Sequence, residues 1–119
     1  MKKCKIYNLE ERTYVFARDC RLLVRDFSKT INNIEDGKQL VRSSGSIGAN
    51  YIEANEKLGD KDFLMWMKIA RKEAKESGYW LRLLWDMNDS HRKKINELKN
   101  EALEIKKILS AIINKSSTY

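Results

Sequence analysis

The segment from Leu40 to Ala54 has the pattern of a helix interior, yet small residues crowd it. Each glycine inside a helix costs about 1 kcal/mol relative to alanine, because its backbone loses more freedom on folding. A chain keeps such glycines where another backbone must come close, since a larger side chain would hold the two apart. We therefore expect this helix to pack unusually tightly against its neighbours. The small residues are Ser43, Ser44, Gly45, Ser46, Gly48, Ala49 and Ala54.

The composition favours long helices joined by short loops. The 119 residues include no proline, whereas average usage would place about six in a chain of this length. Proline interrupts helices, so its absence removes one common reason for a helix to stop. Charged residues make up 34% of the chain, as expected of amphipathic helices that each expose a polar face. The length predicts a single domain that spans residues 1–119.

Capping signals and apolar periods predict four helices. Asn8 and Glu11 form a capping-box pattern before the first helix. Gly59 is a stop signal for the second helix, and Asp60 is a cap for the third. The predicted helices span about 8–29, 34–58, 61–88 and 91–115. Four helices with short connections favour an all-α fold, an antiparallel up-down-up-down four-helix bundle.

The apolar faces of these helices predict the core. The first helix presents Phe16, Cys20, Leu23 and Phe27, and the second presents Leu40, Ile47, Tyr51 and Leu58. The fourth helix has a heptad seam of Ile95, Leu98, Ala102, Ile105, Leu109 and Ile112. The third helix has one core stripe, made of Phe63, Met67, Ala70, Ala74, Ser77, Leu81 and Leu84.

A second apolar stripe on the third helix suggests another surface to cover. One stripe is enough to bury a helix in a small bundle. We therefore assign Trp66, Ile69 and Trp80 to an oligomer interface. Exposed aromatic rings also stack on unpaired bases, whereas aromatic residues on such a helix more often serve packing. Both interpretations apply to Trp66, Tyr79, Trp80 and Trp85.

Basic residues recur on single helix faces, and the net charge is +7. Such faces either contact phosphates, which gives affinity without sequence preference, or are solvated faces balanced by nearby acids. The charge excess lies on the first and last helices, since residues 1–30 sum to +4 and residues 89–119 to +3. The candidate nucleic-acid-binding residues are Arg18, Arg21, Arg25, Lys61, Lys68, Lys72, Lys75, Arg82, Arg92, Lys99 and Lys106.

Three polar residues stand out in the small-residue helix. Arg42 and Asn50 are eight residues apart and therefore lie near one face, and Glu53 is one turn beyond Asn50. They form either a ligand or catalytic site, or a structural polar network that fixes helix register or subunit geometry. We favour the structural network, because no nucleophile or metal ligand lies nearby in the sequence.

Familiar cofactor and catalytic patterns are missing from the sequence. A di-metal bundle needs two Glu-x-x-His pairs, but His91 is the single histidine. Cys4 and Cys20 lack the spacing of metal or redox sites and are expected to be reduced thiols of a cytoplasmic protein. No phosphate-binding glycine loop, signal peptide or membrane span is evident. We expect no metal, no cofactor and no enzymatic activity.

Two motifs carry a resemblance to a known family. Gln39–Ala54 resembles the first signature of the bacterial four helix bundle protein family, and Lys72–Leu81 resembles the second. Members of this family include proteins encoded in intervening sequences of large-subunit ribosomal RNA genes. The resemblance runs from about residue 8 to residue 113. Val41, Gly48 and Ala54 depart from it, since many members have a basic residue, a proline and a glycine there.

The resemblance implies a homopentamer. It also implies similarity to the accessory protein of diversity-generating retroelements, which is a basic pentamer that engages nucleic acid and a reverse transcriptase. The sequence therefore predicts a non-enzymatic homo-oligomer that binds RNA or DNA through its basic faces. The alternative is a protein–protein scaffold or accessory subunit, whose partner is another protein and which has no direct role with nucleic acid.

Overall fold

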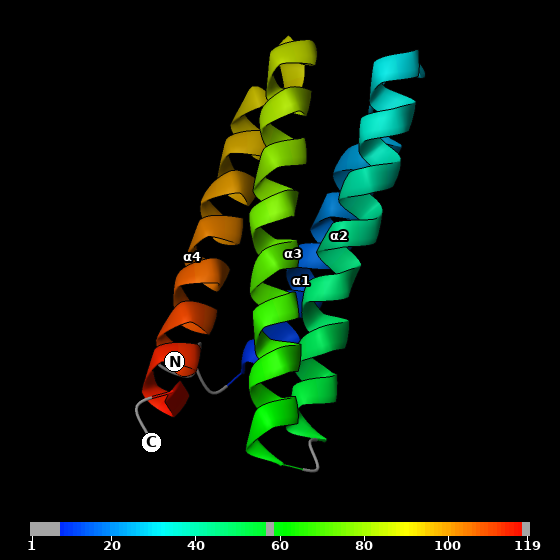
Figure 1. Cartoon of the computed structure of the whole chain (residues 1–119). Coiled ribbons are helices and arrows are strands. Elements are labelled where there is room, and N and C mark those ends of the chain that lie inside the picture. The colour runs from blue at the N-terminus through cyan, green and yellow to red at the C-terminus, as the bar shows by residue number, and fades with distance from the viewer. Residues whose placement is uncertain (1–7, 57–58, 118–119) are drawn as a thin grey trace.

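Residues 8–56 and 59–117, which the computed structural model describes, form four antiparallel helices. The elements are α1 (Leu9–Arg25), α2 (Ile31–Asn55), α3 (Asp60–Met87), the 3-10 turn η2 (Asp89–His91) and α4 (Arg92–Ser117). The helices alternate in direction, and the start of α1 lies at the same end as the end of α4 (Figure 1). The predicted up-down-up-down four-helix bundle is confirmed. Among the described helices, none has the length and hydropathy needed to span a bilayer.

Each helix packs on its neighbours in sequence. The contacts of α2 with α3 and of α3 with α4 are the most extensive, whereas α1 meets α4 over a smaller area. The α1–α4 contact is fastened by one forked ion pair. The Nε and Nη2 atoms of Arg12 donate to the two carboxylate oxygens of Glu101 at 2.6 and 2.9 Å. The fork geometry of guanidinium and carboxylate favours this bidentate pairing.

The helix boundaries differ from the predicted ones by a few residues. The first helix ends at Arg25, and α2 begins at Ile31, three residues before the predicted start. The earlier start has a clear cause, because the Thr30 hydroxyl accepts a hydrogen bond from the Asn33 amide at 3.2 Å and caps the helix. The predicted end of α2 at Leu58 lies outside the described residues.

Asn8 occupies the predicted cap position of α1 without capping through its side chain, and the predicted cap of α3, Asp60, was wrong. Asn8 precedes α1 but makes no side-chain capping hydrogen bond. A capping side chain needs an extended backbone, but the backbone of Asn8 (φ −111°, ψ 39°) is not extended. Asp60 is the first helical residue of α3 instead of its cap, and the preceding Gly59 is the extended residue at the cap position.

The predicted core faces are largely confirmed. The predicted residues of α1 are buried, and so is the α3 core stripe except for half-buried Phe63. On α4 the seam is buried from Ile95 to Leu109, but Ile113 then replaces Ile112 as the buried residue. A straight α-helix drifts by about 20° per heptad relative to an exact seven-residue repeat, which explains the change of register.

Small residues on α2 let two helices come close. A methyl group added at Gly48 would lie 2.8 Å from the Thr13 hydroxyl and 3.3 Å from Thr13 Cβ on α1. On the other side of α2, the buried hydroxyls of Ser43 and Ser77 are 2.8 Å apart and join α2 to α3. The tight packing expected from the sequence is therefore present on both sides of this helix.

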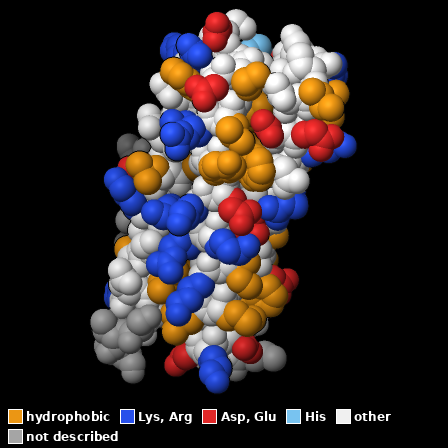
Figure 2. All heavy atoms as spheres, turned by 45° about the horizontal axis from the view of Figure 1, so that its top comes forward, with side chains coloured by type: hydrophobic (Ala, Val, Ile, Leu, Met, Phe, Trp, Pro, Cys, Tyr) orange, Lys and Arg blue, Asp and Glu red, His pale blue; other side chains and the backbone are white. Residues whose placement is uncertain are grey.

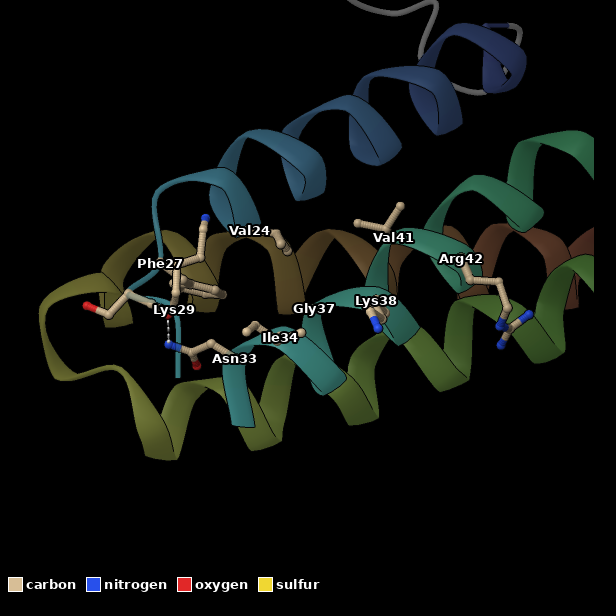
Figure 3. Close-up of a pocket in the computed structure, with 10 residues that line it drawn as sticks. Val24, Phe27, Lys29, Asn33, Ile34, Gly37, Lys38, Val41 and Arg42 are labelled. Carbon is tan, nitrogen blue, oxygen red and sulfur yellow. Dashed lines mark hydrogen bonds between the residues drawn. The ribbon is translucent and has the colours of Figure 1, made fainter. Parts of the chain in front are cut away.

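Two buried asparagines join the loops at one end of the bundle. Asn33 and Asn88 exchange reciprocal amide hydrogen bonds of 2.9 and 2.8 Å. Asn33 also donates to the Ser28 carbonyl oxygen (Figure 3), and Asn88 donates to the Leu84 carbonyl oxygen. Each buried amide group thus finds partners, and the α1–α2 loop is fixed to the end of α3.

Replacing Gly48 with alanine is expected to destabilise the fold. Thr13 is buried and short, so it cannot move away from a new methyl group, and the free energy of unfolding should fall by about 1–2 kcal/mol. Gly78→Ala is the matched control, because nothing lies within 4 Å of a methyl group there. It should raise the free energy of unfolding by about 0.5–1 kcal/mol. Chemical denaturation measures both, and an unchanged Gly48→Ala variant would contradict the packing argument.

Candidate nucleic-acid interface

Basic side chains from α3 and α4 line one groove between these helices. Lys68 and Lys75 are two turns apart on α3, as are Lys99 and Lys106 on α4, so each pair shares a helix face. Figure 2 shows Lys and Arg side chains gathered over the side of α3 that lies next to α4. We call this feature the basic groove. It is lined by Lys68, Arg71, Lys72, Lys75, Lys99 and Lys106.

The groove consists of two adjoining clefts. One has a volume of about 450 Å³ and extends from Lys68 to Ser110, and the other has a volume of about 250 Å³. Lys75 and Lys106 line both clefts, which makes the groove continuous. The floor of the smaller cleft is made of small residues, namely Ala74, Gly78 and Ala102.

Most of the charge in the basic groove is not neutralised. Lys68, Lys75, Lys99 and Lys106 form no ion pair with any acid of the described residues. Lys72 is the exception, because its Nζ lies 3.5 Å from both Glu73 and Glu76. A concave surface lined by one sign of charge attracts polyanions and concentrates them at its wall.

Arg71 lines the basic groove but was not among the residues predicted from the sequence. Its guanidinium donates a hydrogen bond of 3.4 Å to the Ser110 hydroxyl and so bridges α3 to α4. Arg71 lies one turn from Lys68 and Lys75, and this spacing was the signal in the sequence that could have identified it.

The predicted basic residues of α1 lie elsewhere. Arg18 and Arg25 pair with the adjacent acids Asp19 and Asp26. Arg21 lies over Gly45 of α2 and donates to the Ala17 carbonyl oxygen at 3.0 Å. These arginines therefore form a second basic surface on α1, which does not line the basic groove.

Three further predicted residues also lie outside the groove. Lys61 is exposed in the first turn of α3, and Arg82 is exposed two turns beyond Lys75. Arg92 has a structural role at the turn between α3 and α4. It lies 3.9 Å above the Trp85 ring, donates to the Trp85 carbonyl oxygen at 3.0 Å and pairs with Asp89 at 3.1 Å.

The predicted network of Arg42, Asn50 and Glu53 is replaced by other contacts. Arg42 reaches across to α3, where its guanidinium nitrogens lie 3.3 Å from Glu73 and 2.9 Å from Glu76. Asn50 donates back to the Ser46 carbonyl oxygen of its own helix, and Glu53 is exposed. The cause is the long side chain of arginine, which reaches past its own helix face to a buried glutamate on the next helix.

The residues predicted to form an oligomer interface lie on one side of α3. Trp66 and Trp80 are half-buried against the core, and Ile69 is half-exposed beside them. Met65 and Met87 extend the same apolar side into solvent. The second stripe predicted for α3 is therefore a partly exposed surface, interrupted by the glutamates that Arg42 pairs with.

An apolar hollow of about 420 Å³ lies between α1 and α2 (Figure 3). Val24 of α1 and Phe27, which follows α1, line one side of the hollow. Ile34 and Val41 of α2 line the other side. A methyl group at Gly37 would lie 2.9 Å from Val24, so Val24 packs directly on this glycine. This hollow lies on a different side of the bundle from the basic groove.

His91 and Cys20, which were considered for catalysis, both take part in packing. His91 contacts Phe27 edge-to-face, with ring centroids 5.1 Å apart. Cys20 is buried, and burial raises the pKa of its thiol to about 12. Cys4 lies outside the described residues. Within the described residues, no group of three or more histidine, cysteine or acidic side chains is arranged to hold a metal ion.

The fold and the groove together define an all-α four-helix bundle with a basic groove between its last two helices. The chain belongs to the family of 23S rRNA-intervening sequence proteins, whose model matches residues 5–111. This membership confirms the family inferred from the two sequence motifs.

A similar solved structure has the same fold. It is the crystal structure of a protein of unknown function from the S23 ribosomal protein family of Bacteroides thetaiotaomicron VPI-5482. The two sequences are 32% identical, and the TM-score is 0.81. The match covers 92% of this chain and 98% of that chain. No curated protein matches the chain.

The Cys20 thiol is expected to resist modification in the folded protein. Because its folded pKa of about 12 lies above the ordinary value of 9.0, the thiol stays protonated and unreactive at pH 8. In a Cys4→Ser variant, a disulfide reagent should react at least ~100-fold more slowly with native protein than with denatured protein. Stability should be unaffected by this thiol below pH 9 and should fall as the pH rises from about 9 towards 12. Modification of native protein at the rate of a free thiol would contradict this environment.

Proposed function

We propose that this chain is a non-enzymatic, cytoplasmic protein that binds RNA or DNA through the basic groove. The observation that carries the proposal is the convergence of lysines from two helices on one concave surface. Four of these lysines have no acidic partner in the described part of the chain, so their charge is available to phosphates. Family membership agrees with a role near ribosomal RNA, because the family is named for an intervening sequence of 23S rRNA.

Binding through this groove is electrostatic and weakly sequence-specific. Lysine and arginine that neutralise phosphates release counterions, so affinity falls steeply as salt rises. The four unpaired lysines of the groove are flexible point charges, which suit phosphates better than base edges. The expected ligand is therefore the sugar–phosphate backbone.

We also infer that the chain forms a homo-oligomer, which we take to be a pentamer as the family resemblance implies. The partly exposed apolar side of α3, which contains Trp66, Ile69 and Trp80, supports this inference. An apolar surface of this kind is stabilised when a second copy covers it. Five chains at +7 each would carry about +35, which would strengthen attraction to polyanions.

A scaffold role is the second candidate. The apolar hollow between α1 and α2 favours it, because a protein side chain fits such a surface better than a phosphate does. If the wild-type protein binds no oligonucleotide at 50–200 mM salt, a protein partner becomes the better explanation.

Reversal of charge in the basic groove is expected to abolish binding. The test variant carries Lys68→Glu, Lys75→Glu and Lys106→Glu. The matched control carries Lys38→Glu, Lys94→Glu and Lys107→Glu, three exposed lysines outside the groove that pair with Glu35, Glu97 and Glu104. Both variants change the net charge equally, so a general charge effect would weaken both.

Fluorescence anisotropy with a labelled oligonucleotide measures the outcome. The groove variant should bind at least ~100-fold more weakly, and the slope of log affinity against log salt should fall by about 2. The control variant should bind within about 5-fold of wild type. Equal losses in both variants would show that the groove is not the site.

The oligomer is tested by the mass of the particle in solution. Five chains of 14.0 kDa give about 70 kDa by light scattering. Ile69→Glu places a charge on the apolar side of α3 and should shift the mass towards one chain. Leu22→Glu on α1 is the control and should leave the mass unchanged, because this residue is exposed on a different helix. A wild-type mass of one chain would refute the oligomer.

A further inference from the structure

We infer that the basic groove takes nucleic acid in its single-stranded form, and that Tyr79 stacks on one of the unpaired bases. This inference rests on the proposed function and names the form of the ligand. Proteins that bind single strands combine a positively charged groove, which follows the backbone, with aromatic side chains on which bases stack. Both parts occur together on α3.

Tyr79 is the one aromatic residue of α3 whose side chain is largely exposed. Its exposed fraction is 55%, whereas Trp66, Trp80 and Trp85 are partly buried against the core. Packing therefore accounts for the tryptophans but not for the exposed face of Tyr79. The Tyr79 ring meets the Trp80 ring edge-to-face at 5.1 Å, so it is partly ordered before any base arrives. An ordered ring loses less conformational entropy on binding than a free one.

The position of Tyr79 places it beside the lysines of the groove. It lies one turn after Lys75 and one turn before Arg82, so the three side chains are neighbours on the helix surface. Neither Lys75 nor Arg82 forms an ion pair within the described residues. A strand whose phosphates lie along the lysines would therefore present a base to the exposed tyrosine.

Gly78 gives an independent reason to expect close approach of a ligand. A glycine inside a helix costs about 1 kcal/mol, and at Gly37 and Gly48 the close approach of Val24 and Thr13 explains the glycine. Nothing lies within 4 Å of a methyl group built at Gly78, so helix packing does not require the glycine. The residue lines the smaller cleft together with Lys75, Lys99 and Lys106. Its open surface lets a sugar–phosphate backbone lie directly on the helix.

The shape of the groove favours a single strand over a duplex. Neighbouring helices pack about 8–10 Å apart, so the space between α3 and α4 is narrow and concave. A double helix is convex and is recognised mainly across its grooves by protruding elements, and its paired bases are not free to stack on a side chain. A duplex would contact the outer lysines but would leave Gly78 and Tyr79 unused.

The test compares three labelled ligands at 100 mM salt by fluorescence anisotropy. They are a 12-nucleotide oligouridine, an abasic strand of the same length and a 12-base-pair RNA duplex. The wild-type protein should bind oligouridine about 10-fold more tightly than either of the others. Tyr79→Ala should lose this advantage, binding oligouridine about 10-fold more weakly while its affinity for the abasic strand and its salt slope stay unchanged. Tyr79→Phe keeps the ring and should bind as wild type does.

Several outcomes would overturn the inference. One is a Tyr79→Ala variant that binds oligouridine as tightly as wild type, and another is a wild-type protein that binds the duplex as tightly as the single strand. In either case the charge-reversed groove variant would still lose binding, so the proposed function would survive. If the wild-type protein binds none of the three ligands, both the proposed function and this inference fail. Circular dichroism and light scattering on each variant serve as controls for fold and mass.

Discussion

The close contact of α1 with α2 at Gly48 and Thr13 sets the geometry on which the rest of the bundle depends. Because Gly48 has no side chain, Thr13 of α1 packs directly on α2, and α1 lies near enough to α2 to bury its apolar face with only 17 residues. Arg12 then fastens the same helix to α4 through Glu101. On the other side of α2, the hydroxyl pair of Ser43 and Ser77, 2.8 Å apart, joins α2 to α3. Protein interiors pack densely, so a change of one methyl group at such contacts is felt.

Glycine has two different roles in this bundle. At Gly48 the missing side chain is replaced by Thr13 of the neighbouring helix, and the glycine serves packing. At Gly78 the space is left open, and lysines from two helices surround it. The extensive contact between α3 and α4 holds this open surface in place. The groove is thus a consequence of how the last two helices pack, and the charge around it is the basis of the proposed binding of polyanions.

The fold could be predicted from the sequence because it depends on periodic patterns along each helix. The heptad seam of α4 and the core stripe of α3 identify buried faces without knowledge of the partner helix. The capping residues were harder, since Asn8 and Thr30 are both good caps by type and only the backbone conformation distinguishes them. The Asn33–Asn88 pair joins residues 55 positions apart, and no local pattern predicts such a contact.

The candidate site was predictable in part. The seven-residue spacing of lysines on α3 and α4 identified most of the basic groove, but the sequence could not show how the two helices are rotated towards each other. For this reason the sequence did not distinguish the arginines of α1 from the lysines that line the groove. Arg42 shows a second limit, because a long side chain reaches a partner on another helix that its own helix face does not reveal. The residues of α3 that line the basic groove are therefore identified by its packing against α4.

Hydrogen exchange with and without a bound oligonucleotide tests the central claim most directly, because it locates the ligand without any substitution. Binding should slow amide exchange in the segments 68–82 of α3 and 99–106 of α4, which form and adjoin the basic groove. Exchange in α1 around Arg18–Arg25 should be unchanged. Slower exchange confined to α1, with no change in α3 and α4, would contradict the account.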